Sequence, residues 1–350
     1  MINLDSYISS SSAVLICTEV NRFYLSGMKS SDGYMLLSAV GSFLLVDGRY
    51  YEAATKKTYS GIKVILLERL SKQLNDLINR FGIKTLYTET QITVSHLATL
   101  NSIINCTVEA NQALTEELLV ARSVKSEEEI EKIIHAQRIA EAAYSEALNF
   151  IKAGRSEREI ALFLDYEMQK RGSEGVSFET IAVSGENSSL PHGVPGDRVL
   201  QNGDFLTLDF GAVYCGYHSD MTRTVAIGGV SEKMQGVYEL VLKAQSAAIE
   251  KIIEGVSCKA VDAAARDIIT KAGFAGCFNH STGHGVGLEI HEYPRLSNRS
   301  DDKLKNGQVV TVEPGVYLQG VFGVRIEDMI VTRKNTRQNL TNAPKTLIIL

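Results

Sequence analysis

The stretch TGHGVGLEIHE, residues 282–292, contains two histidines, three glycines and two glutamates. Its glycines do not match the dinucleotide-binding pattern G-x-G-x-x-G, because the third glycine stands at position 287 and position 288 is leucine. A single histidine is most often a core residue with a hydrogen-bond partner. Here five of the seven histidines fall between residues 192 and 291, which indicates a shared site: His192, His218, His280, His284 and His291.

Acidic residues flank a predicted β-hairpin upstream of these histidines. In GDFLTLDFGAVYCGYHSDMTRTVAIG, residues 203–228, two alternating runs surround YCGY, which is typical of a turn near residues 214–217. With the centre of this hairpin set between residues 214 and 215, Asp209 is placed directly opposite Asp220, with Cβ atoms about 4.5–5.5 Å apart. Like charges in that arrangement destabilise a hairpin unless one is protonated or a cation binds between them.

A second hairpin repeats the arrangement with glutamates. In GQVVTVEPGVYLQGVFGVRIEDMIVT, residues 307–332, Glu313 and Glu327 are placed symmetrically about Gly320. One opposed acidic pair could be a coincidence among the 41 acidic residues of the chain. Two pairs with histidines between them favour a cation site.

Length and composition restrict the class of protein. A chain of 350 residues predicts two domains, and its 44% hydrophobic and 22% charged residues are typical of a soluble globular protein. The net charge of -5 argues against nucleic acid and anionic membranes as partners. The N-terminal segment has neither a signal peptide nor a membrane span, so a cytoplasmic protein is expected. Five scattered cysteines indicate reduced thiols.

The sequence pattern predicts two domains of different character. Up to about residue 118, short β-branched runs alternate with helical patterns, which favours an α/β domain. The segment DGRYYEAA within it is interpreted as a solvated turn outside the site. Two capping boxes, Ser126 with Glu129 and Ser156 with Glu159, predict helix starts in the second part. The order of that part, helix pair, β region, helix pair, β region, suggests two related halves.

Five motifs together resemble the pita-bread metallopeptidases, and within them are most similar to Xaa-Pro aminopeptidases and prolidases: LDFG, SDMTRT, STGHGVGLEIHE, TVEPGVY and VRIED. The resemblance implies an α+β protein with a creatinase-like α/β domain over residues 1–118 and a pita-bread catalytic domain over 119–350. It also implies five metal ligands: Asp209, Asp220, His284, Glu313 and Glu327.

The resemblance further implies two divalent ions with a bridging hydroxide as nucleophile. Hard oxygen ligands favour Mn²⁺, with Co²⁺, Zn²⁺ and Fe²⁺ left open. Gly283 and Gly285 are expected to let the backbone pass close to the ions. Three further roles are expected: Glu313 as ligand and proton shuttle, His192 and His291 as substrate-binding and catalytic hydrogen-bond donors, and Arg325 as a substrate-site residue that holds a ligand carboxylate.

The expected substrates are small peptides with proline at the second position. An Xaa-Pro aminopeptidase is favoured over an Xaa-Pro dipeptidase (prolidase), because no stretch marks a clamp for a free C-terminal carboxylate. A metal-free creatinase-type hydrolase and a non-catalytic binding module of the same fold are the alternatives from other classes. A methionine aminopeptidase is a nearer alternative, but it lacks the creatinase-like domain. A homodimer is expected from the resemblance, with no nucleic-acid or membrane partner.

Overall fold

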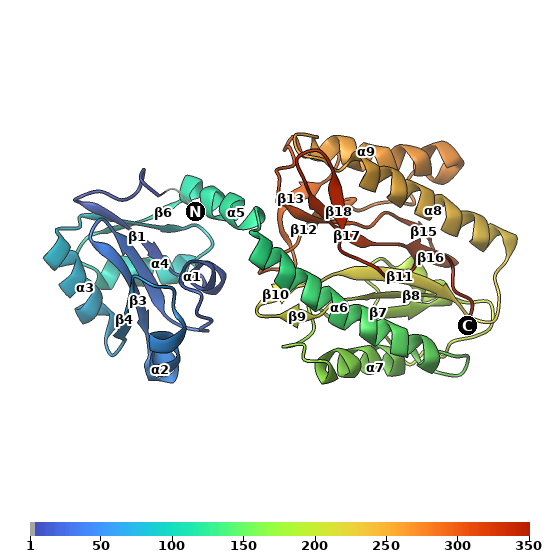
Figure 1. The fold of residues 1–350 in the computed structure, drawn as a ribbon, viewed down its shortest axis with the longest axis horizontal. Helices are drawn as coiled ribbons and strands as arrows, with labels where there is room; N and C mark the ends of the chain where they lie inside the picture. Colours follow the sequence, from blue (N-terminus) through green and yellow to red (C-terminus); the bar gives the residue numbers. More distant parts are fainter. Residues whose placement is uncertain (1–3) are drawn as a thin grey trace. The chain divides into compact units, whose positions relative to one another are not determined.

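The structure is a computed structural model that describes residues 4–350. The chain divides into two compact units, Met1–Arg122 (the N-terminal unit) and Ser123–Leu350 (the C-terminal unit; Figure 1). The predicted boundary between residues 118 and 119 falls within helix α5 (Gln112–Ser123), and the domain limits stay a prediction. Within the described range, no helix is both long and apolar enough to cross a membrane.

The N-terminal unit is one mixed six-stranded sheet with helices on both faces. Its strand order is β4-β3-β2-β1-β5-β6, with β1, β5 and β6 mutually parallel and β2 antiparallel to both of its neighbours. Alternate residues of β1 point to opposite faces, so Leu15 packs with α3 and α4 while Val14 and Ile16 pack with α5. The strands are β1 (Ser12–Ile16), β2 (Tyr34–Ser38), β3 (Gly41–Val46), β4 (Ile62–Leu66), β5 (Thr85–Glu89) and β6 (Thr107–Asn111), and the helices before α5 are α1 (Glu19–Ser26), α2 (Gly48–Lys57), α3 (Leu70–Phe81) and α4 (Val94–Ile103).

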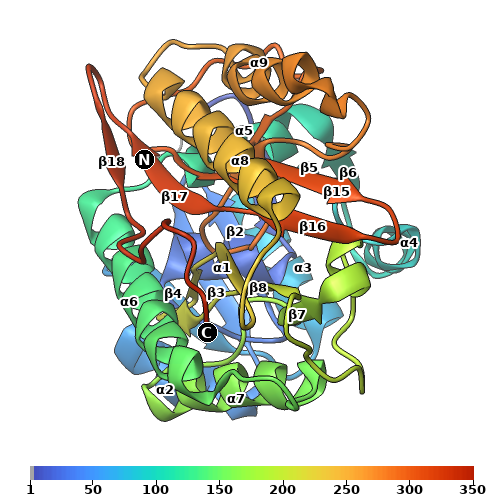
Figure 2. The ribbon, with the colours of Figure 1, turned by 90° about the vertical axis from the view of Figure 1, so that its right-hand side faces the viewer.

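Two helix pairs cover the C-terminal unit. The first pair is α6 (Glu127–Phe150) and α7 (Glu157–Lys170), and the second is α8 (Glu232–Lys251) and α9 (Cys258–Ile269). Both predicted capping boxes are confirmed, because Ser126 and Ser156 accept from the backbone of Glu129 and Glu159, whose side chains accept in return. Figure 2 shows α8 crossing over β16 and β17, while α6 and α7 lie on another side of the unit. The predicted alternation of helix pairs and β regions is therefore confirmed.

The strands of the C-terminal unit form two main sheets between these helix pairs. A three-stranded sheet has the order β11-β8-β7, and a five-stranded sheet has the order β13-β12-β14-β17-β18. Two short hairpins, β9–β10 and β15–β16, extend from them. The bounds are β7 (Ile181–Ser184), β8 (Phe205–Phe210), β9 (Val213–Tyr214), β10 (Tyr217–His218), β11 (Met221–Ala226), β12 (Gly283–Gly285), β13 (Glu292–Leu296), β14 (Val309–Val312), β15 (Gly315–Leu318), β16 (Phe322–Arg325), β17 (Asp328–Thr332) and β18 (Arg337–Asn339), with short helices η1 (Gly185–Ser189) and η2 (Thr270–Phe274).

The predicted register of the aspartate hairpin is wrong. Asp209 is paired with Thr222, and Asp220 lies just before β11. The reason is the turn, where Tyr214 pairs with Tyr217 and the two residues between them, Cys215 (φ 49°) and Gly216 (φ 78°), have left-handed backbone. The turn lies at the predicted residues, but its loop centres the hairpin between Cys215 and Gly216, one residue later than predicted, and this shifts every pair by two positions. The two aspartates are therefore diagonal neighbours.

The predicted symmetry of the glutamate hairpin is confirmed. Gly315 pairs with Arg325 in one ladder, and Val312 pairs with Asp328 in the other, so both ladders share one register about Gly320. Glu313 and Glu327 lie at the junction between the two ladders. Their side chains are thus placed at a break in the strands, where neither ladder covers them.

Candidate metal centre

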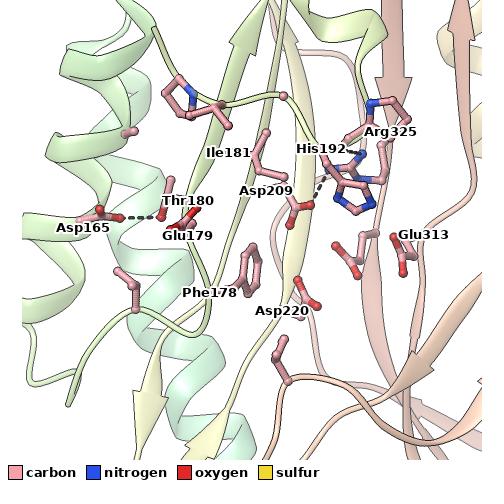
Figure 3. Close-up of a pocket in the computed structure, with 18 of the residues that line it drawn as sticks. Asp165, Phe178, Glu179, Thr180, Ile181, His192, Asp209, Asp220, Glu313 and Arg325 are labelled. Atoms are coloured by element: carbon pink, nitrogen blue, oxygen red, sulfur yellow. Dashed lines mark hydrogen bonds and ion pairs between the residues drawn. The ribbon is translucent and has the colours of Figure 1, made fainter.

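Five side chains with metal-binding atoms gather at one end of a single pocket (Figure 3). His284 Nε2 lies 3.6 Å from Asp220 Oδ2 and 3.5 Å from Glu313 Oε1. The possible ligand atoms of Asp220, His284 and Glu327 lie within 4.8 Å of one another. The group comes from both main sheets and the glutamate hairpin: Asp209 in β8, Asp220 before β11, His284 in β12, Glu313 before β15 and Glu327 before β17.

The electrostatics of this cluster suit a cation. Burial, together with the neighbouring carboxylates, raises the pKa of Asp220 and of Glu327 well above their ordinary values. Burial likewise raises the pKa of Glu313 to about 8. Asp209 Oδ1 is buried, and among residues 4–350 it has no hydrogen-bond partner. A bound cation would stabilise carboxylates that ionise with difficulty, and it would give the Asp209 oxygen a partner. Both observations therefore fit a site for divalent ions.

The imidazole of His284 is held in the form that binds metals. Its Nδ1 lies 3.0 Å from the carbonyl oxygen of Gly285, which leaves Nε2 facing the carboxylates. Burial lowers the pKa of His284 to about 4, so the ring is neutral at physiological pH. A neutral imidazole whose other nitrogen donates to a carbonyl is the usual histidine ligand.

The glycines on either side of His284 serve strand packing. A Cβ on Gly283 would collide with the carbonyl of Thr311, and one on Gly285 would collide with the carbonyl of Tyr293. The expected close approach of the backbone to bound ions stays a prediction beside this packing role. Glycine is needed because β12 is pressed between β13 and β14.

Arg325 is buried beside the carboxylates and connects them. Its guanidinium forms an ion pair with Asp209, and its Nε donates to Thr222 Oγ1 at 3.1 Å. The hydroxyl of Thr222 donates in turn to Glu327 Oε2 at 2.7 Å. Nη1 of Arg325 donates to the Tyr317 hydroxyl at 2.8 Å and to the Pro191 carbonyl at 3.1 Å. The guanidinium of Arg325 thus orients two of the five side chains of the cluster, Asp209 directly and Glu327 through the Thr222 hydroxyl.

The histidines of the pocket differ in their surroundings. The rings of His284 and His291 meet edge to face with centroids 4.4 Å apart, and burial lowers the pKa of His291. His192 is exposed on the pocket wall, on the segment between η1 and β8. The structure therefore brings both to the carboxylate end of one pocket. His218 instead contacts Ser177 Oγ through Nδ1 at 2.9 Å, away from the pocket wall.

His280 is predicted only as one of the five clustered histidines, and neither Tyr317 nor Thr222 is among the predicted site residues. His280 Nδ1 lies 4.0 Å from Glu313 Oε2, its Nε2 lies 2.9 Å from the Tyr317 hydroxyl, and burial lowers its pKa to about 3. The register of the glutamate hairpin could have indicated Tyr317, because Tyr317 and Arg325 are diagonal neighbours on one face. Nothing in the sequence pattern marks the contacts of His280.

The pocket has a volume of about 880 Å³, which suits a small ligand. Beyond the carboxylates its wall becomes largely apolar. A polar pair, Thr180 hydrogen-bonded to Asp165, stands at the end formed by α7 (Figure 3). The apolar lining includes Phe178, Ile181, Pro191, Val194 and Ile290.

A cluster of four carboxylates and one imidazole between two helix pairs suits a metal-dependent hydrolase. The model of metallopeptidase family M24 matches residues 131–334, and that of the creatinase/prolidase N-terminal domain matches residues 9–133. The chain therefore belongs to metallopeptidase family M24 and is a hydrolase. The predicted architecture, a creatinase-like domain followed by a pita-bread domain, is confirmed.

One relative and two solved structures are similar to this chain along nearly its whole length. A protein of Pyrococcus horikoshii named Xaa-Pro dipeptidase is 39% identical over 337 residues, which are 96% of this chain and 94% of the relative. The structure of an Xaa-Pro dipeptidase from Bacillus anthracis has a TM-score of 0.93 at 39% identity and covers 97% of this chain and 95% of its own. That of an X-Pro aminopeptidase from Thermotoga maritima has a TM-score of 0.91 at 37% identity and covers 97% of both chains.

Proposed function

We propose that this protein is an exopeptidase with two divalent metal ions that hydrolyses the bond between an N-terminal residue and a following proline in small peptides. The observation that carries the proposal is the convergence of four carboxylates and the Nε2 atom of His284 at one end of a single pocket. Relatives named Xaa-Pro dipeptidase and X-Pro aminopeptidase support it.

The metal ligands in this proposal are Asp209, Asp220, His284, Glu313 and Glu327. Four carboxylates balance the four positive charges of two divalent ions, and an oxygen-rich set with a single imidazole suits Mn²⁺. Ions bound there would polarise the scissile carbonyl and lower the pKa of water. The buried oxygen of Asp209 without a partner and the raised pKa values of the other carboxylates support this set.

Glu313 is the proton carrier in the proposed reaction. It lies between the rings of His284 and His280 and faces the pocket. Its carboxylate accepts the proton of the attacking water and passes it to the proline nitrogen, which needs a proton to leave as an amine.

His192 and His291 bind the substrate and stabilise the transition state. Both line the pocket, next to the carboxylate end. Each ring can donate a hydrogen bond to the substrate carbonyl or to the oxyanion that replaces it, and donors aimed at a developing charge accelerate the reaction most. Arg325 acts indirectly, by holding Asp209 and the Thr222 hydroxyl in place.

Selectivity for proline follows from the chemistry of its nitrogen. An Xaa-Pro bond is a tertiary amide without an N–H, and the ring fixes φ, so peptidases that need that donor cleave it poorly. The proposed site needs only the carbonyl on the ions and space for a ring beyond it. The apolar lining next to the histidines offers that space.

Peptide length is the point on which we depart from the sequence-based preference for longer peptides. Arg295 is exposed next to the site, and its positive charge is felt by both His291 and Glu313. Such a cation can pair with the free carboxylate of a dipeptide. Because relatives are also named Xaa-Pro dipeptidase, we propose dipeptides as the preferred substrates and keep Xaa-Pro aminopeptidase as the second candidate.

A panel of Ala-Pro, Ala-Pro-Ala and Ala-Ala-Ala, assayed with Mn²⁺, Co²⁺, Zn²⁺ and Fe²⁺ after chelation, tests the proposal. We expect no activity without metal and fastest turnover of Ala-Pro. Faster turnover of Ala-Pro-Ala would favour the aminopeptidase, and a preference for Ala-Ala-Ala would exclude selectivity for proline. Activity that survives chelation would point to the metal-free hydrolase, and metal-independent binding without turnover to the binding module. A homodimer and a cytoplasmic location stay predictions.

A further inference from the structure

The position of His192 depends on the chain around it. Its side chain is exposed, and in the part of the chain that the structure describes no hydrogen bond holds its ring. The residue lies on the segment 185–196, which begins with η1 and forms one wall of the pocket. Whatever fixes this segment therefore fixes the imidazole.

One buried carboxylate outside the pocket contacts both ends of this segment. Glu157 is the first residue of α7 and its exposed fraction is 0%. Its Oε1 accepts from the backbone N–H of Ser184 at 2.7 Å and from the Ser184 hydroxyl at 2.9 Å. Its Oε2 accepts from the backbone N–H of Gly196 at 3.2 Å. The Asn187 amide donates to both oxygens at 3.2 Å.

Backbone contacts extend this anchor, which consists of Glu157, Ser184, Asn187 and Gly196. The backbone N–H of Glu157 donates to the Arg198 carbonyl, and that of Arg158 donates to the Gly196 carbonyl, both at 3.0 Å. Arg198 also donates to the Ser184 hydroxyl at 2.6 Å. The start of α7 and the two ends of the segment thus form one unit.

The side of the segment toward the metal cluster is held separately. The Pro191 carbonyl accepts from Arg325 Nη1 at 3.1 Å, and Gly323 N–H donates to the Ser188 hydroxyl at 2.9 Å. His192 therefore follows a residue tied to the metal cluster and precedes a stretch tied to Glu157. Loss of the Glu157 carboxylate removes its hydrogen bonds to Ser184 and Gly196, while the backbone contacts at the start of α7 remain.

We infer that Glu157 is a positioning residue for His192: its carboxylate closes the base of the segment and so places the imidazole against the substrate. The inference rests on the proposed function. Glu157 does not line the pocket, so it acts through the segment and not on the substrate. An error of about 1 Å in the placement of a catalytic group can cost about 100-fold in rate.

Glu157→Gln is the sharpest substitution, because it keeps the shape of the side chain. An amide has only one accepting oxygen, so its NH₂ group must face a donor of Ser184, Asn187 or Gly196. We expect turnover of Ala-Pro to fall about 10- to 100-fold, while the metal content stays at the wild-type value. Hydrogen exchange of the amides from 184 to 196 should become faster.

A double-mutant cycle separates positioning from a general effect on stability. If Glu157 acts through His192, adding Glu157→Gln to His192→Ala should lower turnover by less than about threefold further. The inference would be overturned if the fold-loss of turnover in the double variant equalled the product of the fold-losses in the two single variants. Wild-type turnover in Glu157→Gln alone would also overturn it. Should Glu157→Gln fail to fold, Asn187→Ala removes the donor shared by both oxygens, and the same cycle and the same outcomes apply.

Glu159→Gln is the matched control, because it lies on the same helix and its carboxylate also accepts a backbone N–H, that of Ser156 at 2.8 Å. It is exposed and does not touch the segment, so we expect wild-type turnover, with unchanged exchange from 184 to 196. A loss equal to that of Glu157→Gln would contradict a specific role for Glu157. If wild-type protein cleaves none of the peptides with any metal, the proposed function fails and the inference with it, and this result is visible before any variant is made.

Discussion

Arg325 and Asp209 form a buried ion pair between residues 116 positions apart in the chain. Asp209 comes from the three-stranded sheet and Arg325 from the glutamate hairpin, so the pair joins the two parts of the metal cluster. The guanidinium donates to Oδ2 of Asp209, while Oδ1 is buried and has no hydrogen-bond partner among residues 4–350. The ion pair therefore orients the Asp209 carboxylate within the cluster.

Arg325→Lys should impair metal binding despite keeping the charge. A lysine ammonium cannot reach Asp209, Thr222 and Tyr317 in the fork geometry of a guanidinium. We expect metal affinity or turnover to fall about 10- to 100-fold, as is usual when a group that orients metal ligands is lost. Isothermal titration with Mn²⁺ and Ala-Pro kinetics measure both. Arg333→Lys, at an ion pair with the exposed Glu127, is the control and should behave as wild type.

Asp209→Ala and Glu327→Ala should each lose at least one ion and nearly all hydrolysis. Each removes a carboxylate from a cluster whose charge is needed to hold two divalent ions. Elemental analysis of the purified variants, together with Ala-Pro turnover, checks this. Two ions per chain with wild-type turnover in either variant would rule out the ligand set.

His284→Ala and His291→Ala should differ although their rings are in contact. Loss of His284 should release metal, because its Nε2 faces Asp220 and Glu313. Loss of His291 should leave both ions in place and lower turnover about 10²- to 10³-fold, as expected for a donor to the transition state. If His291→Ala binds fewer ions than wild type, His291 is itself a metal ligand, and the proposed division of roles between the two histidines is wrong.

Lys125→Met should destabilise the C-terminal unit. Lys125 Nζ lies 2.8 Å from Glu292 Oε2, and the two side chains are only 1% and 2% exposed. Removing the cation takes one counter-charge away from a buried carboxylate, and breaking a buried pair in this way costs about 3–5 kcal/mol. Chemical denaturation measures the change in free energy of unfolding. Lys56→Met breaks a pair with Glu52 whose side chains are 69% and 83% exposed and should cost less than about 1 kcal/mol.

Features set by near neighbours in the chain could be predicted from the sequence. The capping boxes at Ser126 and Ser156 require only residues within one helical turn. The symmetry of Glu313 and Glu327 about Gly320 depends only on a hairpin without bulges between them. The error at Asp209 and Asp220 is also local, since the turn lies at the predicted residues but its loop, Cys215 and Gly216, sets the centre of the hairpin one residue later than predicted.

The sequence by itself determined the residue types of the cluster and their order, because carboxylates and histidines at motif spacing need no knowledge of packing. The prediction that Arg325 holds a ligand carboxylate did not say which one, and only the tertiary structure decided the partner of each side chain. Arg325 on Asp209, Tyr317 on His280 and the carboxylate of Glu157 at the base of the His192 segment depend on the final packing of several elements. Hydrogen-bond partners of buried polar groups are selected by that packing, since a group removed from water must bond to whatever donor or acceptor the fold brings to it.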